Sequence, residues 1–429
     1  MPSLDPGARR AILDAVTALE GEAVDRLAAL VRCESTLGRE AGALELMAAN
    51  YEAIGLAPRR IPTDPEALRG HPGFSPPLIS YAGRDNVAAI HTPRETKGRS
   101  LALQGHVDVV PEGAADLWIT PPYEPSVRDG RMYGRGAGDM KAGIVSYLTA
   151  FQALRLAGLQ PAATVQMQAV IEEECSGNGA LATMLAMPRT EAVVIPEPGP
   201  GFAAMYSAEV GVVWAWVTVT GRPTHVRDMH AGINAIEAAM HVASRFKDYE
   251  NERNRAENIH AAFRGVNHPV NVNLGTVEGG EWNSSVPTRA RIGLRVGVML
   301  GYTAAQTKAD IERIVAEAAG DPALRGTQVK LEFKGFMADP CAFDMGSEIC
   351  NLARRSFAEA SGGTLRDYPA TGLTDGRFFT LYQDTPVACF GPDAQEIHGI
   401  DESVGLSSMH DITRSIALLM AEWCGVEAA

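Results

Sequence analysis

The chain has 429 residues, which exceeds the range of about 250–300 residues at which one hydrophobic core stops growing, so two domains are expected. Its composition, 46% hydrophobic and 21% charged, excludes an intrinsically disordered chain. The net charge of −14 argues against a nucleic-acid partner, because a groove that holds phosphates needs a surplus of lysine and arginine.

The amino-terminal segment and the cysteines indicate the cellular compartment. The segment from Met1 to Leu19 mixes charged with apolar residues, unlike a signal peptide, and no run of about 18 apolar residues could form a membrane span. The six cysteines are scattered, without a C-x-x-C pair, as is typical of reduced and buried thiols. We therefore predict a cytoplasmic protein without a membrane partner.

Residues 1–207 alternate between predicted helices and strands. Apolar residues at helical spacing predict two helices over 8–57, and a loop rich in proline and glycine follows over 62–84. Strands are expected at Asn86–His91, Ser100–Gln104, Thr164–Ile171 and Glu191–Ile195, and helices at Lys141–Ala157 and Gly179–Met187. This alternation favours an α/β fold whose sheet is at least partly parallel.

The pattern changes near residue 208. The next expected elements are strand Val210–Thr220, a helix over 233–247, strands Val270–Thr276 and Ala290–Val298, helix Thr303–Ala319 and strand Gln328–Lys334. The order β-α-β-β-α-β is that of a ferredoxin-like α+β domain. It is complete within residues 208–335, a length typical of one domain.

The α/β pattern returns after residue 335. Helix Ser347–Ala360, strand Pro386–Phe390 and helix Ser408–Trp423 are expected there. We therefore predict one α/β domain formed by residues 1–207 and 336–429, with the ferredoxin-like domain of residues 208–335 inserted into it.

Polar residues that can carry chemistry follow the ends of several predicted strands, where the catalytic groups of open α/β sheets collect. His106 ends one strand, and Asp108 follows two residues later. Such a histidine can bind a metal through one ring nitrogen while the carboxylate accepts a hydrogen bond from the other. The alternative is a structural histidine that its neighbouring aspartate satisfies.

A glycine-rich segment, Gly134-Arg135-Gly136-Ala137-Gly138, precedes Asp139 at the start of a predicted helix. Its G-x-G-x-G spacing, with no Gly-Lys-Ser/Thr after it, does not fit a phosphate-binding loop. We interpret it as a tight turn that brings Asp139 beside His106.

Further acidic residues and a histidine lie in three other loops of the same kind. Glu172, Glu173 and Glu174 follow an apolar strand, and crowding three carboxylates is costly unless something positive neutralises them. The alternative is a solvated acidic loop. Glu197 lies between two prolines, which give it a rigid backbone that suits a ligand or, alternatively, a stiff surface loop; His398 occupies another strand-end loop.

Together these loops supply two histidines and several carboxylates. Nitrogen and oxygen ligands without cysteine fit zinc, manganese or cobalt rather than a cysteine-rich structural zinc site. A carboxylate left over beside the ligands is what activation of a water molecule needs. The sequence therefore indicates a metal-dependent hydrolase.

In this order the motifs resemble those of the acetylornithine deacetylase and succinyl-diaminopimelate desuccinylase family, relatives of the carboxypeptidase G-type metallopeptidases. The resemblance covers about residues 20–425. It implies a mixed-sheet catalytic domain with an inserted dimerising lid. It also implies two divalent metal ions, with zinc expected first and cobalt or manganese as alternatives. The implied reaction is hydrolysis of an amide bond in an N-acylated amino acid or a similar small amine.

The resemblance assigns a role to each metal-site residue. Asp139 would bridge the two metals. His106 and Glu197 would complete one site, and Glu174 and His398 the other.

Two acids take other roles in the same pattern. Asp108 would orient His106, and Glu173 would be the general base. Because three glutamates are consecutive, the register remains open, and Glu172 could take the place of Glu173.

The inserted domain resembles the family's lid. The segment 221–225 matches a motif whose histidine reaches the active site of the partner subunit, which implies a homodimer and a catalytic role for His225. The alternative is a histidine that caps its own helix. Asn283 and Arg295 match a substrate-facing region of the lid, and Arg377 matches a substrate loop. For both arginines the alternative to carboxylate binding is an ordinary ion pair between domains.

Three functions remain open on the sequence. The first is a deacylase of N-acyl amino acids or a dipeptidase, acting on a small-molecule amide. The second is an amidohydrolase for a different kind of amide, such as a formylated aminopyrimidine. The third, a non-catalytic dimeric binding protein, predicts a missing base or ligand, and all of these positions are filled.

Overall fold

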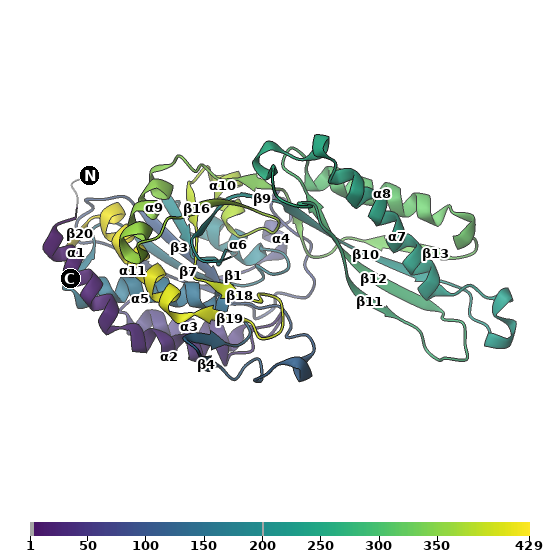
Figure 1. Cartoon of the computed structure of the whole chain (residues 1–429), viewed down its shortest axis with the longest axis horizontal. Coiled ribbons are helices and arrows are strands. Elements are labelled where there is room, and N and C mark those ends of the chain that lie inside the picture. Colours follow the sequence, from purple (N-terminus) through teal and green to yellow (C-terminus); the bar gives the residue numbers. More distant parts are fainter. Residues whose placement is uncertain (1–3, 200) are drawn as a thin grey trace.

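The computed structural model describes residues 4–199 and 201–429 and has two lobes, each built on its own sheet (Figure 1). The main sheet of the larger lobe has the order β1-β2-β7-β3-β8-β17. Its strands are β1 (Pro58–Pro62), β2 (Asp85–His91), β3 (Leu101–His106), β7 (Val165–Val170), β8 (Ala192–Ile195) and β17 (Val387–Cys389). The last four of these run parallel to one another, and β2 is antiparallel to both of its neighbours, so the sheet is mixed as expected.

Helices cover both faces of this sheet. One face carries α1 (Pro6–Ala18), α2 (Glu20–Val31), α3 (Ala41–Ala53), α5 (Ala142–Leu156), α9 (Glu348–Ser361) and α11 (Leu406–Cys424). The other face carries α4 (Pro65–Leu68), α6 (Asn178–Ala186) and α10 (Gly376–Gln383). Because side chains of a strand alternate between faces, Leu101 and Leu103 join the first buried cluster and Ala102 joins the second.

The prediction of two helices over residues 8–57 is wrong, because three are present. The helix α1 ends at Ala18 and α2 begins at Glu20, with Leu19 between them. The buried residues keep a helical spacing across this junction, from Val16 through Leu19 to Ala23. Apolar periodicity alone therefore does not reveal the break.

Several short strands were not expected from the sequence. β9 (Ala204–Glu209), β15 (Cys341–Ala342) and β16 (Arg366–Ala370) form a three-stranded sheet, and β6 (Leu159–Pro161) pairs with β20 (Val426–Ala428). A four-stranded sheet contains β4 (Ser126–Arg128), β5 (Arg131–Tyr133), β18 (Ala394–Gln395) and β19 (Ser403–Gly405). Since β5 pairs with β19, the loop between β18 and β19 is held beside the glycine-rich segment that follows β5.

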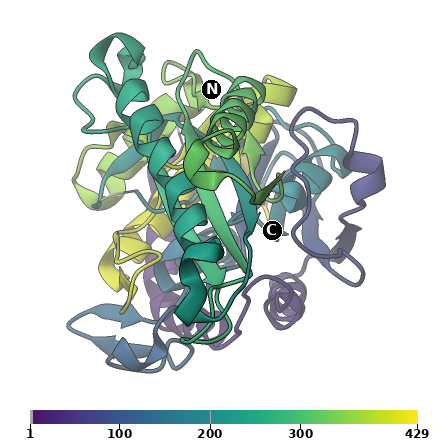
Figure 2. The same ribbon diagram turned by 90° about the vertical axis from the view of Figure 1, so that its right-hand side faces the viewer.

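The smaller lobe is ferredoxin-like, as the element order predicts. Its elements are β10 (Gly211–Thr220), α7 (Ala235–Arg253), β11 (Val272–Gly279), β12 (Arg289–Val298), α8 (Ala304–Ala319), β13 (Gln328–Glu332) and the short β14 (Met337–Ala338). The sheet order is β11-β12-β10-β13, and all neighbours are antiparallel. Both helices lie on one side of these strands (Figures 1 and 2). Short helices elsewhere include η2 (Ala137–Lys141) and η3 (Val226–Ala231).

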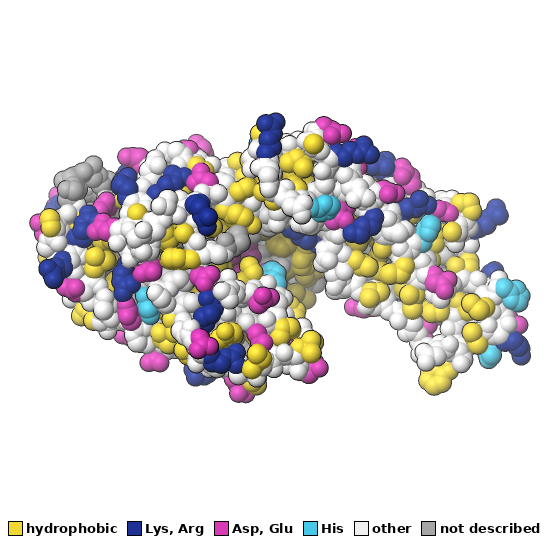
Figure 3. Space-filling view, in the orientation of Figure 1, with side chains coloured by type: hydrophobic (Ala, Val, Ile, Leu, Met, Phe, Trp, Pro, Cys, Tyr) yellow, Lys and Arg dark blue, Asp and Glu magenta, His cyan; other side chains and the backbone are white. Residues whose placement is uncertain are grey.

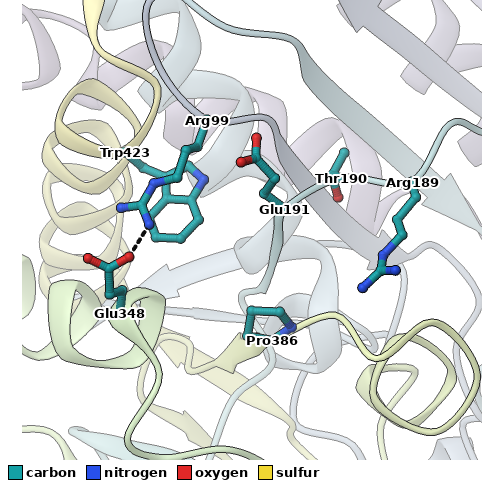
Figure 4. Close-up of a pocket in the computed structure, with 7 residues that line it drawn as sticks. All are labelled: Arg99, Arg189, Thr190, Glu191, Glu348, Pro386 and Trp423. Carbon is teal, nitrogen blue, oxygen red and sulfur yellow. Dashed lines mark hydrogen bonds and ion pairs between the residues drawn. The ribbon is translucent and has the colours of Figure 1, made fainter. Parts of the chain in front are cut away.

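A shallow hollow of about 480 Å³ lies at the amino ends of β3, β8 and β17 (Figure 4). It is lined by Arg99, Arg189, Thr190, Glu191, Glu348, Pro386 and Trp423. The Arg99 guanidinium lies 3.4 Å from the centre of the Trp423 ring and forms an ion pair with Glu348. Its charge is therefore paired within the chain. No helix in the described part of the chain is both long and apolar enough to cross a bilayer.

Candidate metal centre

The carboxyl end of β3 carries His106, whose ring is buried. Its Nδ1 donates a hydrogen bond to the backbone oxygen of Asp108 at 2.9 Å, while the Asp108 carboxylate lies 3.7 Å away. The orienting contact that the sequence assigns to the carboxylate is thus made by the backbone carbonyl of the same residue. Its Nε2 faces Asp139 and Glu197, at 3.1 and 3.7 Å, and is the ring nitrogen left to bind a metal.

Glu402 holds the glycine-rich segment that positions Asp139. Its buried carboxylate accepts backbone N–H groups from Gly136 and Gly138, each at 2.9 Å, and from Asp139 at 3.0 Å. It also forms an ion pair with Arg135 at 2.7 Å. Gly136 has a φ of 78°, in the left-handed region that glycine adopts without strain. Sequence reasoning gave Glu402 no role, because its partners lie more than 250 residues earlier in the chain.

His398 lies opposite His106 across the Asp139 carboxylate. The Nε2 atom of His398 is 3.3 Å from Oδ2 of Asp139, whereas His106 faces Oδ1. It is also 3.0 Å from Oε2 of Glu174. Asp139 therefore offers one oxygen to each side, the arrangement that a carboxylate bridging two metal ions requires.

Glu172 is held away from this cluster. It is fully buried, pairs with Arg84 at 2.6 Å, and accepts hydrogen bonds from Tyr81 and from the Ser176 hydroxyl. The same arginine pairs with buried Glu40. The carboxylate of the first glutamate of the run is therefore satisfied by partners outside the cluster.

The next two glutamates point into the site. The Asp108 carboxylate accepts the backbone N–H groups of Glu173 and Glu174, at 3.3 and 3.2 Å, and so ties their loop to the end of β3. Oε2 of Glu173 is 3.9 Å from Nε2 of His106, and Glu174 faces His398. The structure thus places Glu173 and Glu174 beside the histidines, while Glu172 pairs with Arg84.

The buried carboxylates of this cluster would be stabilised by a nearby positive charge. Burial raises the pKa of Glu173 and of Glu197 well above the usual range of a glutamate. Oε1 of Glu173 and Oε2 of Glu197 are buried without a hydrogen-bond partner. Although burial would lower the pKa of His106, the charge of Glu197 and the hydrogen bond with Asp139 raise it well above its usual value.

The pKa of His398 is raised by neighbouring carboxylates in the same way. The charge of Glu174 raises the pKa of His398 to about 11. Atoms of His106, Asp139 and Glu174 lie within 4.8 Å of one another, close enough to hold one ion. Unpaired buried carboxylate oxygens beside two imidazoles are a donor set that suits divalent cations, so these residues fit a metal centre.

A cavity of about 470 Å³ opens beside the cluster, in the hollow between the lobes that Figure 3 shows. Its lining includes Asp108, Glu173, Glu174 and His398 from the larger lobe. Arg295 of β12 lines the same cavity from the smaller lobe and donates to the backbone oxygen of Thr371 at 3.0 Å. A molecule in this cavity would contact both the metal centre and the smaller lobe.

The three remaining residues that were expected to contact the substrate also lie outside this cavity lining. Arg377 is buried and donates to the backbone oxygens of Thr374 and Ser176, at 2.9 and 3.3 Å. Asn283 and His225 are exposed on the smaller lobe. Nδ1 of His225 accepts the backbone N–H of Arg227 at 3.0 Å, so in a single chain this histidine caps η3.

Asp375 is a further acid that sequence reasoning passed over. Its carboxyl group is buried, and its Oδ1 has no hydrogen-bond partner. Burial raises the pKa of Asp375 to about 6, while the charges of Arg377 and His106 act against this increase. The motif that contains it was noted for Arg377, but nothing in the local pattern distinguished the aspartate.

The sequence and the fold are similar to those of known proteins. A model of peptidase family M20/M25/M40 matches residues 102–422. A succinyl-diaminopimelate desuccinylase from Parvibaculum lavamentivorans is 25% identical over 399 residues, which are 89% of this chain and 91% of the relative.

Two further similarities widen the range of relatives. An N-formyl-4-amino-5-aminomethyl-2-methylpyrimidine deformylase from Halalkalibacterium halodurans is 24% identical over 382 residues, 81% of this chain and 85% of the relative. The structure of human carnosine dipeptidase 1 superposes with a TM-score of 0.77 and 14% identity, covering 99% of this chain and 100% of that one. At that identity the likeness concerns the fold.

Proposed function

The chain belongs to peptidase family M20/M25/M40, and on that premise we propose that it is a di-metal hydrolase that cleaves an amide bond in an N-acylated amino acid or a similar small amine. The observation that carries the proposal is the cluster formed by the buried His106, the exposed His398 and buried carboxylate oxygens without a partner, beside an open cavity. A polar cluster of this kind next to a ligand-sized cavity is characteristic of an active site.

The ligands divide between two ions. Asp139 would hold both, with His106 and Glu197 on one and Glu174 and His398 on the other. Zinc is the metal we propose, and cobalt or manganese would accept the same nitrogen and oxygen donors. When bound, the two ions supply a water molecule of lowered pKa and polarise the acyl carbonyl.

Glu173 is the general base in this proposal. Its Oε1 is buried without a protein partner, while its backbone is held by Asp108. A free carboxylate oxygen at this place can take a proton from the attacking water and pass it to the leaving amine. Asp108 would act by positioning, through its backbone oxygen on His106 and its carboxylate on the Glu173–Glu174 loop.

Among the expected substrate-binding residues, Arg295 has the most support. It lines the cavity, and its planar guanidinium suits a substrate carboxylate. Arg377 donates to two backbone carbonyls instead, which favours a structural role. A role for Asn283 would require the lobes or a second subunit to bring it to the site.

A homodimer is part of the proposal. β11 is an edge strand of the smaller sheet, and most of its residues are exposed, including the apolar Leu274 and Val277. Exposed edge strands pair readily with another strand, and a two-fold axis is the commonest way for identical chains to associate. We propose that His225 reaches the active site of the partner and stabilises the charge that develops on the acyl oxygen.

A cytoplasmic location fits the six free cysteines, of which Cys175, Cys341, Cys350, Cys389 and Cys424 are buried. Thiols that remain unpaired are typical of a reducing compartment. No nucleic-acid partner is proposed, because the chain carries a net charge of −14.

A second candidate function is hydrolysis of an amide whose amine is not an amino acid. The similarity to a formylated aminopyrimidine deformylase favours it. Because the fold is also like that of a dipeptidase, peptide bonds remain candidate substrates. The scaffold alone does not decide among these substrates.

The test is an activity screen of the metal-reconstituted protein with acetyl-, formyl- and succinyl-amines and with dipeptides, together with metal analysis after dialysis. We expect about two divalent ions per chain and hydrolysis that a chelator abolishes. A metal content of zero, with activity that a chelator leaves unchanged, would refute the proposed mechanism.

The intersubunit role of His225 is tested by mixing two inactive variants, His225→Ala and Glu173→Gln, under conditions of subunit exchange. If His225 acts in the partner's site, each mixed dimer has one site with both lesions and one with neither. Activity should then return towards half of the wild-type value per mixed dimer. Mixed dimers that form and stay inactive would show that His225 acts within its own subunit.

A further inference from the structure

The outer face of the smaller sheet is aromatic where it borders the cavity. Along β10, Val213, Ala215 and Val217 are buried in the cluster shared with α7 and α8. Because strand residues alternate between faces, Trp214 and Trp216 project to the opposite side, where both line the cavity. Hydrophobic surface is visible in this hollow in Figure 3. Both indoles thus line the same cavity as Glu174 and His398 of the candidate metal centre.

Each indole is fixed by its neighbours. The ring of Trp216 lies beside Gly293, its partner on β12, where a Cβ would come within 2.8 Å of the indole. Its Nε1 donates to the backbone oxygen of Lys334 at 3.2 Å. Trp214 packs edge to face against Phe336, with ring centres 5.4 Å apart. Contacts that fix side chains in advance reduce the entropy lost on binding.

The rest of the cavity lining limits the charge of a ligand. The larger lobe contributes Leu37, Leu78, Val109, Val110 and Leu373, all apolar. The ionisable residues on that side belong to the proposed metal centre or hold its loop. Arg295 is the one arginine or lysine among the described residues that line the cavity. Arg291 lies outside this lining, with its guanidinium 4.3 Å from the centre of the Trp216 ring. Since Arg295 is the one such cation within the described lining, a ligand group with a second negative charge would lose its hydration in the cavity without a further cationic side chain there, which is costly.

We infer that the substrate is an amide that carries an aromatic or large apolar group and at most one carboxylate, with that group packed against Trp214 and Trp216. This inference rests on the proposed function, because it assumes that the cavity holds the molecule whose amide bond is cleaved. Aromatic stacking and the removal of apolar surface from water supply the preference, and Arg295 accommodates the single carboxylate.

The first test compares substrates that differ in one group. N-acetylphenylalanine is compared with N-acetylaspartate, which varies the amine part, and N-benzoylalanine with N-succinylalanine, which varies the acyl part. We expect kcat/KM to favour the aromatic member of at least one pair by about 10-fold or more, the effect of one good aromatic contact. Equal values in both pairs, or a preference for the doubly charged member, would overturn the inference.

The second test asks whether the two indoles cause the preference. Trp214→Leu and Trp216→Leu should each lower the ratio of kcat/KM for the preferred aromatic substrate to that for N-acetylalanine, by about 5- to 10-fold. Trp214→Phe is the matched control, since it keeps a ring at the same place and should retain most of the ratio. A ratio that stays at the wild-type value in both leucine variants would assign the preference elsewhere and contradict the inference.

A binding measurement separates this inference from the proposed reaction. Glu173→Gln protein is titrated calorimetrically with the same four amides, so that no turnover is needed. If aromatic amides bind more tightly but wild-type protein hydrolyses none of the panel, the reaction is wrong and the inference holds. If amides are hydrolysed and bound without preference, the reaction holds and the inference is wrong. Neither binding nor hydrolysis would refute both.

Discussion

The two ends of the same parallel strands carry two cavities of nearly equal size and different character. The cavity at the carboxyl ends measures about 470 Å³ and the hollow at the amino ends about 480 Å³. At the amino end, Arg99 pairs with Glu348, and the carboxylate of Glu191 accepts the backbone N–H of Ser100 at 2.8 Å. At the carboxyl end, carboxylate oxygens are buried with no partner. Cavity volume therefore does not distinguish the two ends, whereas buried carboxylate oxygens without a partner do.

The largest expected effect is a loss of activity that occurs for a substitution at the carboxyl ends of the strands and not for one at their amino ends. Glu173→Gln is expected to keep both metal ions and to lose about 10²- to 10⁴-fold in kcat, because a general base typically contributes that much. Glu191→Gln at the amino end is the matched control and should keep the wild-type kcat. Both are measured by steady-state kinetics and metal analysis, with Glu174→Gln expected to weaken metal binding instead. Metal loss from Glu173→Gln alone would mean that Glu173 is a ligand.

The next effect concerns stability at the carboxyl end. Glu402→Gln should lower the free energy of unfolding by about 3–5 kcal/mol, because it leaves the buried Arg135 without a charged partner. It should also weaken metal binding, since Glu402 holds the backbone of Asp139. Urea unfolding of the metal-free protein measures the first effect and metal titration the second. A variant of wild-type stability would show that the loop is held by its other contacts.

A third prediction concerns Glu209, a buried glutamate that tests whether burial makes ionisation of a carboxyl group costly near the carboxyl ends of the strands. It lies beside Thr374, and burial raises the pKa of Glu209 to about 7 from the ordinary 4.5. The folded state then holds its proton more tightly than the unfolded state, so its contribution to stability is present below about pH 4.5 and is lost as the pH rises to about 7.

The measurement compares the wild type with Glu209→Gln by urea unfolding at several pH values. Relative to the variant, the wild type should lose about 2–3 kcal/mol between pH 4.5 and pH 8. Other groups titrate equally in both proteins, and their effects cancel in the difference. A difference that does not change with pH would show that Glu209 keeps an ordinary pKa.

The smallest effect is expected at the amino end. The ion pair of Arg99 with Glu348 is solvated on the carboxylate side, where the side chain is 77% exposed. Glu348→Gln should therefore lower the free energy of unfolding by only about 0.2–1 kcal/mol, and less at high salt. Thermal unfolding at two salt concentrations measures it. A loss as large as that of Glu402→Gln would remove the contrast between the two ends.

Local patterns in the sequence determined most of the element order. The alternation of strands and helices predicted the mixed sheet, and the β-α-β-β-α-β order predicted the ferredoxin-like lobe, as the sheet order β11-β12-β10-β13 confirms. The strand-end positions of His106, Glu174 and Glu197 followed from the same pattern, because the carboxyl ends of parallel strands meet at one edge. The prediction of strands from periodicity failed where a strand is too short to show a repeat, as in the two-residue strands β15 and β18.

Tertiary structure alone decided which charged residues have partners. Glu172, Glu173 and Glu174 are alike in the sequence, and only the approach of Arg84, 88 residues earlier, gives the first of them an ion-pair partner. Likewise Glu402 holds the Asp139 segment across 263 residues, and Trp216 of the smaller lobe lines the same cavity as Glu174 and His398 of the larger one. These relations depend on contacts between distant parts of the chain, which local propensity and spacing do not encode, because a side chain's charge state and role follow from what folding places beside it.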